Sequence, residues 1–270
     1  MNTPATSTTN WSCFPPRTRE VQFDEKWAFV AKKEKNCDPT DPADNHKGDT
    51  WDHVAFDPES RLVVSVVAGE RSAENVIAVV QDFRRRTGGR MMNLITTDGY
   101  AAYEDAILDA YGETVTPPRT GKRGRPKAPY KVAPKDLTYA VVEKTREKGR
   151  VVKIATRVVF GTMTAVVAAL GMSLVSRAIN TSFVERENGT DRHRNARKVR
   201  KTYRFSKDWR FHEAVTYLTM YGLQLLLAGA HAWEPGRSRA VAKAKPRDGG
   251  RTGGSRVVNT RMAVLPRCAM

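Results

Sequence analysis

A regular succession of apolar segments between Val21 and Tyr111 does most to limit the folds open to this chain. Strand-like runs are marked by alternating or continuous apolar residues, and helices by apolar residues at helical spacing. Strands are expected at Val21–Val30, Trp51–Phe56, Arg61–Ala68 and Met92–Thr97, with one helix before the last strand and another at Tyr100–Tyr111. This order predicts an α/β fold, a mixed sheet flanked by helices.

The ends of the expected helices carry suitable residues. Ser72 precedes the first helix, where its hydroxyl can accept a hydrogen bond from a backbone amide of the first turn. Gly88 and Gly89 follow that helix, and Gly112 follows the second. Because glycine tolerates the backbone conformations at helix ends, these positions predict where both helices stop.

The second half of the chain continues the pattern less regularly. Strands are expected at Tyr139–Val142 and Val151–Phe160, the second entered through a turn at residues 147–149. A packed helix is expected at Met163–Leu174, and the chain from Ser182 to about Tyr221 is expected to be predominantly helical.

Composition divides the chain into four regions. Residues 1–17 are rich in Thr, Ser, Asn and Pro and are expected to be a disordered lead-in to a domain at 18–221. Within that domain, the basic Pro- and Gly-rich stretch 116–134 is expected to form a loop or arm. Residues 222–270 form an aberrant tail that is also expected to be disordered.

The charge balance favours a polyanionic partner. Lys and Arg total 46 against 29 Asp and Glu, which gives a formal net charge of +17. Three widely separated cysteines support neither a disulfide framework nor a zinc site, and the longest late apolar run, Leu223–Ala232, is too short to cross a bilayer. We therefore expect a cytoplasmic, DNA-associated protein without a signal peptide or membrane anchor.

Three acidic residues stand at informative positions: Asp24 in the first strand, Asp98 at the end of the fourth, and Glu185 at the start of the basic helix. Taken singly, each has an ordinary structural explanation, such as a plain turn at Asp98-Gly99. Phosphodiester chemistry with two metal ions needs clustered carboxylates, and oxygen ligands favour Mg²⁺ or Mn²⁺. Strand alternation points Glu25 away from the side of Asp24, so we assign Asp24 to the metal.

The expected helix after Ser182 is strongly basic. Glu185 and Arg192 stand close to two turns apart, so a metal-holding carboxylate and a phosphate-holding guanidinium share one face. DNA contacts are expected from Arg192, Arg194, Arg197, Lys198, Arg200, Lys201 and Arg204. Tyr203 and Phe205 are candidates for stacking on exposed bases, and Trp209 for stacking or core packing. The alternative is a solvated basic helix.

A second basic element lies in the expected arm. Residues 121–127 contain a Gly-Arg-Pro core like that of an AT-hook, which binds the minor groove of A·T-rich DNA. Lys122, Arg123 and Arg125 are the candidate DNA-binding residues, and a generic cationic loop is the alternative.

The chain resembles the DDE transposases of the insertion-sequence-one type, whose catalytic core is ribonuclease H-like. The resemblance runs from about Thr18 to Tyr221 and rests on four motifs, at Phe23–Val30, Gly48–Asp57, Thr96–Tyr100 and Thr181–Asn188. It implies that Asp24, Asp98 and Glu185 form the metal-binding and catalytic triad, with two Mg²⁺ (or Mn²⁺) ions, and that Arg192 contacts phosphate. In such enzymes water cleaves at the element end, and the freed 3′ hydroxyl attacks target DNA.

After Tyr221 the chain departs from this family. As a hypothesis, the tail is read out of frame: codons permissible for Gly222–Ala232, advanced by one base, encode AYNFCWPVRT, which looks like the family's closing helix. The same advance over Lys245–Val258 gives a second family-like string. The hypothesis predicts weak or no transposition and is tested by sequencing the gene.

The sequence therefore predicts a transposase whose partners are the element ends and target DNA and which is a homo-oligomer when active. The departure after Tyr221 favours a degenerate copy. Two other functions remain open. One is a non-catalytic DNA-binding relic, and the other is a ribonuclease H-like nuclease that hydrolyses DNA without joining it.

Overall fold

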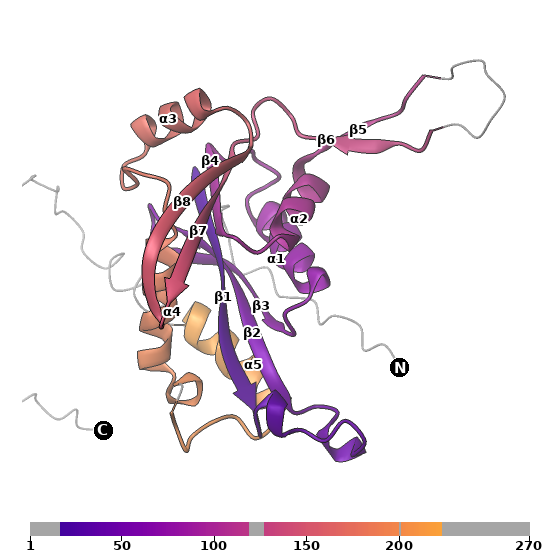
Figure 1. Cartoon of the computed structure of the whole chain (residues 1–270), viewed down its shortest axis with the longest axis vertical. Coiled ribbons are helices and arrows are strands. Elements are labelled where there is room, and N and C mark those ends of the chain that lie inside the picture. The colour runs from indigo at the N-terminus through magenta and orange to yellow at the C-terminus, as the bar shows by residue number, and fades with distance from the viewer. Residues whose placement is uncertain (1–16, 119–126, 200, 223–270) are drawn as a thin grey trace, which may run out of the picture. The chain divides into compact units, whose positions relative to one another are not determined.

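The computed structural model describes residues 17–118, 127–199 and 201–222, and its centre is a six-stranded mixed sheet (Figure 1). The strand order is β3-β2-β1-β4-β7-β8. Strand β1 is antiparallel to β2 and parallel to β4, while β7 is parallel to β4 and antiparallel to β8. The bounds are β1 Glu20–Val30, β2 Gly48–Asp57, β3 Leu62–Gly69, β4 Leu94–Asp98, β7 Tyr139–Glu147 and β8 Arg150–Phe160.

Helices cover both faces of this sheet (Figure 1). Helices α1 (Ala73–Arg86) and α2 (Ala102–Tyr111) pack on one face around Phe23, Phe83 and Ile107. The other face carries α3 (Met163–Met172), α4 (Ser182–Arg194) and α5 (Trp209–Tyr217). The predicted α/β class, a mixed sheet flanked by helices, is confirmed.

Alternation along β1 decides which side chains reach each layer. Val21 and Phe23 are fully buried against α1 and α2. Their neighbours Gln22, Asp24 and Lys26 contact α4 on the opposite face. The face that carries Asp24 is therefore polar and lies under one helix.

The predicted helix ends are confirmed. The Ser72 hydroxyl accepts a 3.3 Å hydrogen bond from the backbone amide of Asn75, at the start of α1. After α1, Gly88 and Gly89 have φ angles of 65° and 73°, which residues with a Cβ rarely adopt. Gly112 caps the end of α2.

The β7–β8 hairpin is longer than the sequence predicted, because β7 continues past Val142 to Glu147. It turns at Lys148 and Gly149, where a turn was predicted, and both residues have positive φ. Before β2, the chain forms two short 3₁₀ helices, η1 (Glu34–Asn36) and η2 (Pro42–Asp44).

The basic stretch 116–134 begins directly after one strand of a small ribbon and contains the other. Strands β5 (Glu113–Val115) and β6 (Tyr130–Val132) pair antiparallel and extend from the end of α2 (Figure 1). The predicted arm therefore has a regular two-stranded base. Lys122, Arg123 and Arg125, at the AT-hook-like segment, lie outside the described residues, as do residues 1–16 of the expected lead-in and the tail beyond Gly222.

The prediction that the chain from Ser182 to about Tyr221 is predominantly helical is confirmed, but the basic helix expected to continue through Arg204 ends earlier. Helix α4 ends at Arg194, and the Asn195 side chain accepts a 3.1 Å hydrogen bond from the Arg197 backbone amide. A 3₁₀ turn η3 (Ala196–Lys198), an irregular segment, α5 and a π-helical turn η4 (Leu218–Gly222) follow.

Two physical causes explain the break. Continuing the helix would stack like charges one turn apart, which destabilises a helix. The break also lets Lys198 enter the interior. It lets the backbone carbonyl of Ser206 accept a 2.7 Å hydrogen bond from the backbone amide of Ala31, just after β1.

Within the described ranges, no helix has the length and apolar character needed to cross a bilayer.

Candidate active site

Asp24 and Asp98 come from neighbouring parallel strands. Gln22 of β1 is opposite Thr96 of β4 in the parallel register. Because each aspartate follows two residues later on its own strand, Asp24 and Asp98 lie side by side on the same face of the sheet. Oδ1 of Asp98 accepts a 3.2 Å hydrogen bond from the backbone amide of Tyr100, which holds the carboxylate at the strand end.

Helix α4 begins over these aspartates because Gln22 anchors its first turn. Oε1 of Gln22 accepts 3.1 Å hydrogen bonds from the backbone amides of Phe183 and Val184. One turn further along the helix, Nδ2 of Asn188 donates a 2.8 Å hydrogen bond to Oδ2 of Asp24. Glu185, in the first turn of α4, is therefore brought to the same region.

The three predicted acidic residues are close enough to influence one another electrostatically. Burial and the charge of Asp98 are the largest causes that raise the pKa of Asp24 to about 7, and Glu25 and Glu185 add to the rise. The hydrogen bond from Asn188 opposes it by stabilising the ionised carboxylate. The negative charges and the burial around Asp24 therefore outweigh the stabilisation that Asn188 gives to its ionised carboxylate.

Glu185 has its own cationic partner. Its carboxylate contacts the ammonium group of Lys144 on β7 and accepts a 2.6 Å hydrogen bond from the Thr181 hydroxyl. The Glu185 side chain is 42% exposed, so it remains accessible from solvent.

The arrangement fits a divalent cation only in part. The surplus of negative charge at Asp24 and the accessible oxygens of Glu185 suit a hard cation. Across the residues that the structure describes, however, no three His, Cys, Asp or Glu side chains are gathered closely enough to form a ready coordination group. The residues are placed around one region without being assembled into a ligand shell.

Glu25 points to the opposite face, as alternation predicted. It forms a 3.0 Å ion pair with Arg71, just before α1, and its side chain is 2% exposed. Burial, followed by the charge of Asp98, raises the pKa of Glu25. Burial and the nearby Glu25 carboxylate also raise the pKa of Tyr103 on α2 well above its ordinary range.

The predicted DNA-contacting residues fall into three groups. Arg192 lies on α4 two turns after Glu185 and is half-buried, while Arg194, Arg197, Lys201 and Arg204 are exposed. Arg200, like the arm residues named above, lies outside the described part of the chain. Lys198 requires a correction: it is 2% exposed and bonded to buried partners, so its ammonium is not available to DNA.

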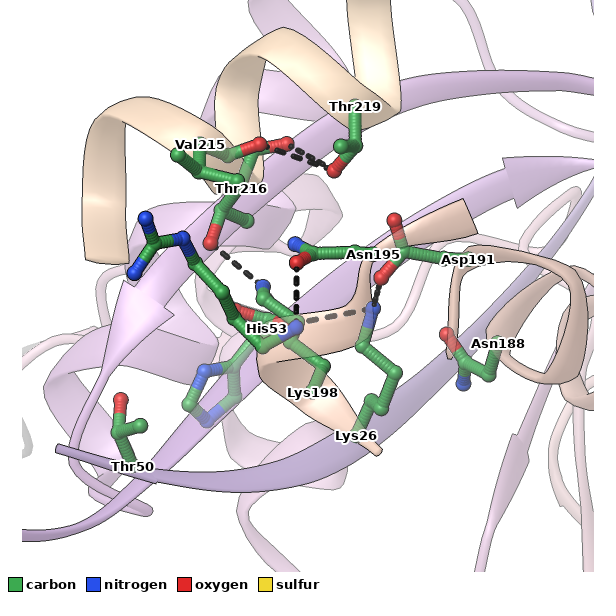
Figure 2. Close-up of polar contacts among 12 residues, drawn as sticks. Lys26, Thr50, His53, Asn188, Asp191, Asn195, Lys198, Val215, Thr216 and Thr219 are labelled. Atoms are coloured by element: carbon green, nitrogen blue, oxygen red, sulfur yellow. Dashed lines mark hydrogen bonds and ion pairs between the residues drawn. The ribbon is translucent and has the colours of Figure 1, made fainter. Parts of the chain in front are cut away.

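Lys198 belongs to a buried ionic cluster that sequence reasoning missed (Figure 2). Its ammonium contacts Asp52 of β2 and the hydroxyl of Thr216 of α5. Lys26 of β1 lies 3.2 Å from the same Asp52 carboxylate and also contacts Asp191 of α4. The cluster therefore joins the sheet to α4, η3 and α5.

The cluster balances its own charge. Burial alone would raise the pKa of Asp52, but Lys198 and Lys26 outweigh burial and hold it well below its usual range. Burial, then the charge of Lys198, lowers the pKa of His212 to about 4, so His212 is neutral at neutral pH. The only signal for this cluster in the sequence was that Lys26 and Asp52 lie inside expected strands. A buried charge there is costly unless it is paired, which indicates an ionic partner.

Comparison with protein-family models and with curated protein sequences gives no match to this chain.

Proposed function

We propose that this protein is a DDE-type DNA transposase that cleaves DNA strands at the ends of an insertion sequence and joins them to target DNA. The observation that carries the proposal is the placement of Asp24, Asp98 and Glu185 around one region, by the β1–β4 register and by the contact of Asn188 with Asp24. Carboxylates from two adjacent strands and a crossing helix are what metal-assisted phosphodiester chemistry requires.

The strand arrangement supports a ribonuclease H-like core as the finer description of the fold. An antiparallel β3-β2-β1 sheet continues into parallel β4 and β7, with α1 and α2 on the face opposite to α4. The fold alone does not specify the reaction, so the proposal depends on the acidic residues rather than on the architecture.

Asp24, Asp98 and Glu185 would hold two Mg²⁺ ions, which activate the attacking oxygen and stabilise the leaving oxygen when bound. The chain's own residues position these ligands. Asn188 orients the Asp24 carboxylate, and the Tyr100 amide orients that of Asp98. The Thr181 hydroxyl donates to the Glu185 carboxylate and holds it at the first turn of α4.

Exposed cations support DNA as the substrate. Arg194, Arg197, Lys201 and Arg204 follow Glu185 in the chain and are open to solvent. Together with the net charge of +17, they favour a polyanion bound beside the acidic region. The proposed partners are the element ends and the target DNA, with a second copy of the chain in the active assembly.

The test is a cleavage and joining assay with a supercoiled plasmid that carries the DNA flanking the coding frame. Asp24→Asn, Asp98→Asn and Glu185→Gln should each abolish Mg²⁺-dependent nicking while leaving DNA binding in EDTA within about twofold. The matched control is Asp136→Asn. Asp136 is an exposed acidic residue just before β7 and is not one of the proposed ligands, so this change should leave nicking unchanged.

The outcomes separate the competing functions. Nicked and joined products support the transposase. Nicking without joining points to a nuclease, and DNA binding without any nicking points to a non-catalytic relic. Retained nicking by the Asp98→Asn protein contradicts the proposed site.

A further inference from the structure

A concave surface opens where α4 ends. It encloses about 500 Å³ between the segment Arg194–Lys207 and the facing sides of α5 and η4. Its lining contains four cationic side chains and no acidic one: Arg194, Arg197, Arg204 and Lys207. We call this surface the cationic cleft. Such a surface attracts an anionic ligand.

Two aromatic side chains also line the cationic cleft. Tyr203 is 99% exposed, so its ring has no intramolecular packing that explains it. The Phe205 ring, by contrast, packs on Phe29 of β1 at a centroid distance of 5.0 Å. The cleft therefore has one aromatic residue anchored to the sheet and one free to stack on a ligand.

Asn195 shapes the cationic cleft where α4 ends. It is 3% exposed, and its Oδ1 accepts the hydrogen bond from the Arg197 amide that ends α4. Its Nδ2 has no hydrogen-bond partner among the described residues. This Nδ2 is buried, so the ligand contacts of the cleft come from its exposed cations and from Tyr203.

We propose that the cationic cleft binds one unpaired nucleotide of the DNA strand, with the phosphate held by the arginines and the base stacked on Tyr203. This proposal rests on the proposed function in taking DNA as the ligand, and its positional prediction also takes Glu185 as part of the cleavage site. A volume of about 500 Å³ suits a small organic ligand better than a phosphate alone. A flat, exposed ring beside guanidinium groups is the combination that binds bases of single strands without regard to sequence.

The position of the cleft predicts which nucleotide it binds. Glu185 lies in the first turn of α4 and Arg194 at its end. The helix advances 1.5 Å per residue, so the two positions are separated by about 14 Å along it. For a DNA strand that runs along α4 at about 3.4 Å per nucleotide, the cleft would hold a nucleotide roughly four positions from the cleaved bond.

The test measures binding in EDTA by fluorescence anisotropy, with a labelled twenty-nucleotide single strand of thymidines and a duplex of the same length. Tyr203→Ala should weaken single-strand binding by about tenfold and duplex binding by less than about twofold. Tyr203→Phe should bind like the parent chain. Phe211→Ala is the matched control, because Phe211 is an exposed aromatic residue on α5 outside the cleft lining.

A second series places a single unpaired base at successive positions of a duplex. Binding should be tightest when that base lies about four positions from the cleaved bond, and Tyr203→Ala should remove this preference. Equal loss of single-strand and duplex binding, or no loss, overturns the proposal. Because single-strand binding in EDTA needs no cleavage, an inactive chain whose single-strand binding depends on Tyr203 would refute the catalytic proposal and leave this one standing.

Discussion

The side-chain amide of Asn188 donates a 2.8 Å hydrogen bond to the carboxylate of Asp24 and so links α4 directly to β1. Asn188 is 3% exposed, and its Oδ1 has no hydrogen-bond partner among the described residues. Asp24 is thus the contact that fixes the orientation of this amide. The same contact brings Glu185, one turn earlier, toward the two aspartates.

Replacing Asn188 should change the ionisation of Asp24. The hydrogen bond stabilises the charged carboxylate, so Asn188→Ala should raise the pKa of Asp24 above its value of about 7. A rise of about one unit is expected for loss of a hydrogen bond to a charged group. Carbon-detected NMR titration of the metal-free protein measures it. Thr190→Ala, which removes a hydroxyl contact elsewhere on α4, is the control; an unchanged or lower pKa contradicts the assignment.

Asp24→Asn should stabilise the metal-free protein while abolishing cleavage. The folded-state pKa of about 7 lies above the unfolded value, so the folded protein binds an extra proton between about pH 4 and 7 and loses stability as the pH rises. The gain from Asp24→Asn should be small near pH 4 and reach up to about 4 kcal/mol at pH 8. Urea denaturation at both pH values measures it. A stability gain that does not depend on pH would show that ionisation of Asp24 does not destabilise the folded protein.

His212 should produce the opposite pH dependence. Its folded-state pKa of about 4 lies below the unfolded value, so the unfolded chain gains a proton first as the pH falls from about 6.5 to 4. The parent chain should therefore lose up to about 3 kcal/mol through this residue over that interval. His212→Gln should remove that loss, and His193→Gln, at an exposed position, should not. If both variants lost the same free energy of unfolding between about pH 6.5 and 4, the buried, neutral state of His212 would be contradicted.

The main parts of the fold and site were predictable because their signals are local. Alternation placed Asp24 and Glu25 on opposite faces of β1, and glycines marked the ends of α1 and α2. Asp98 at a strand end and Glu185 at a helix start needed no knowledge of distant contacts.

The end of the basic helix was not predictable in the same way. Its break after Arg194 depends on Lys198, which gains buried contacts with Asp52, a residue distant in the sequence. Charge density alone favoured DNA contact for Lys198, and only the packing of η3 against β2 and α5 shows otherwise. The cationic cleft exists because of that break, so it too lay beyond sequence reasoning.

The buried ionic cluster should be needed to hold α4 on the sheet. Lys26→Met leaves Asp52 and Asp191 with a single buried cation and should lower the free energy of unfolding by about 3–5 kcal/mol. Lys26→Met combined with Asp191→Leu should cost less than the sum of the single changes, because the two residues are partners. Arg19→Gln, which breaks an exposed pair, should change stability little. Additive losses in urea titrations would contradict the pairing.

Lys144 should compete with the divalent cation for Glu185. Its ammonium contacts the Glu185 carboxylate in the metal-free chain, so Lys144→Met should free those oxygens and tighten cation binding by a few fold. Calorimetric titration with Mn²⁺ and the Mg²⁺ dependence of nicking give two independent readouts, and both should shift to lower metal concentration. Lys153→Met removes an equal charge from an exposed position on β8 and should shift neither. Weaker Mn²⁺ binding in the Lys144→Met protein would show instead that Lys144 positions Glu185 for the metal.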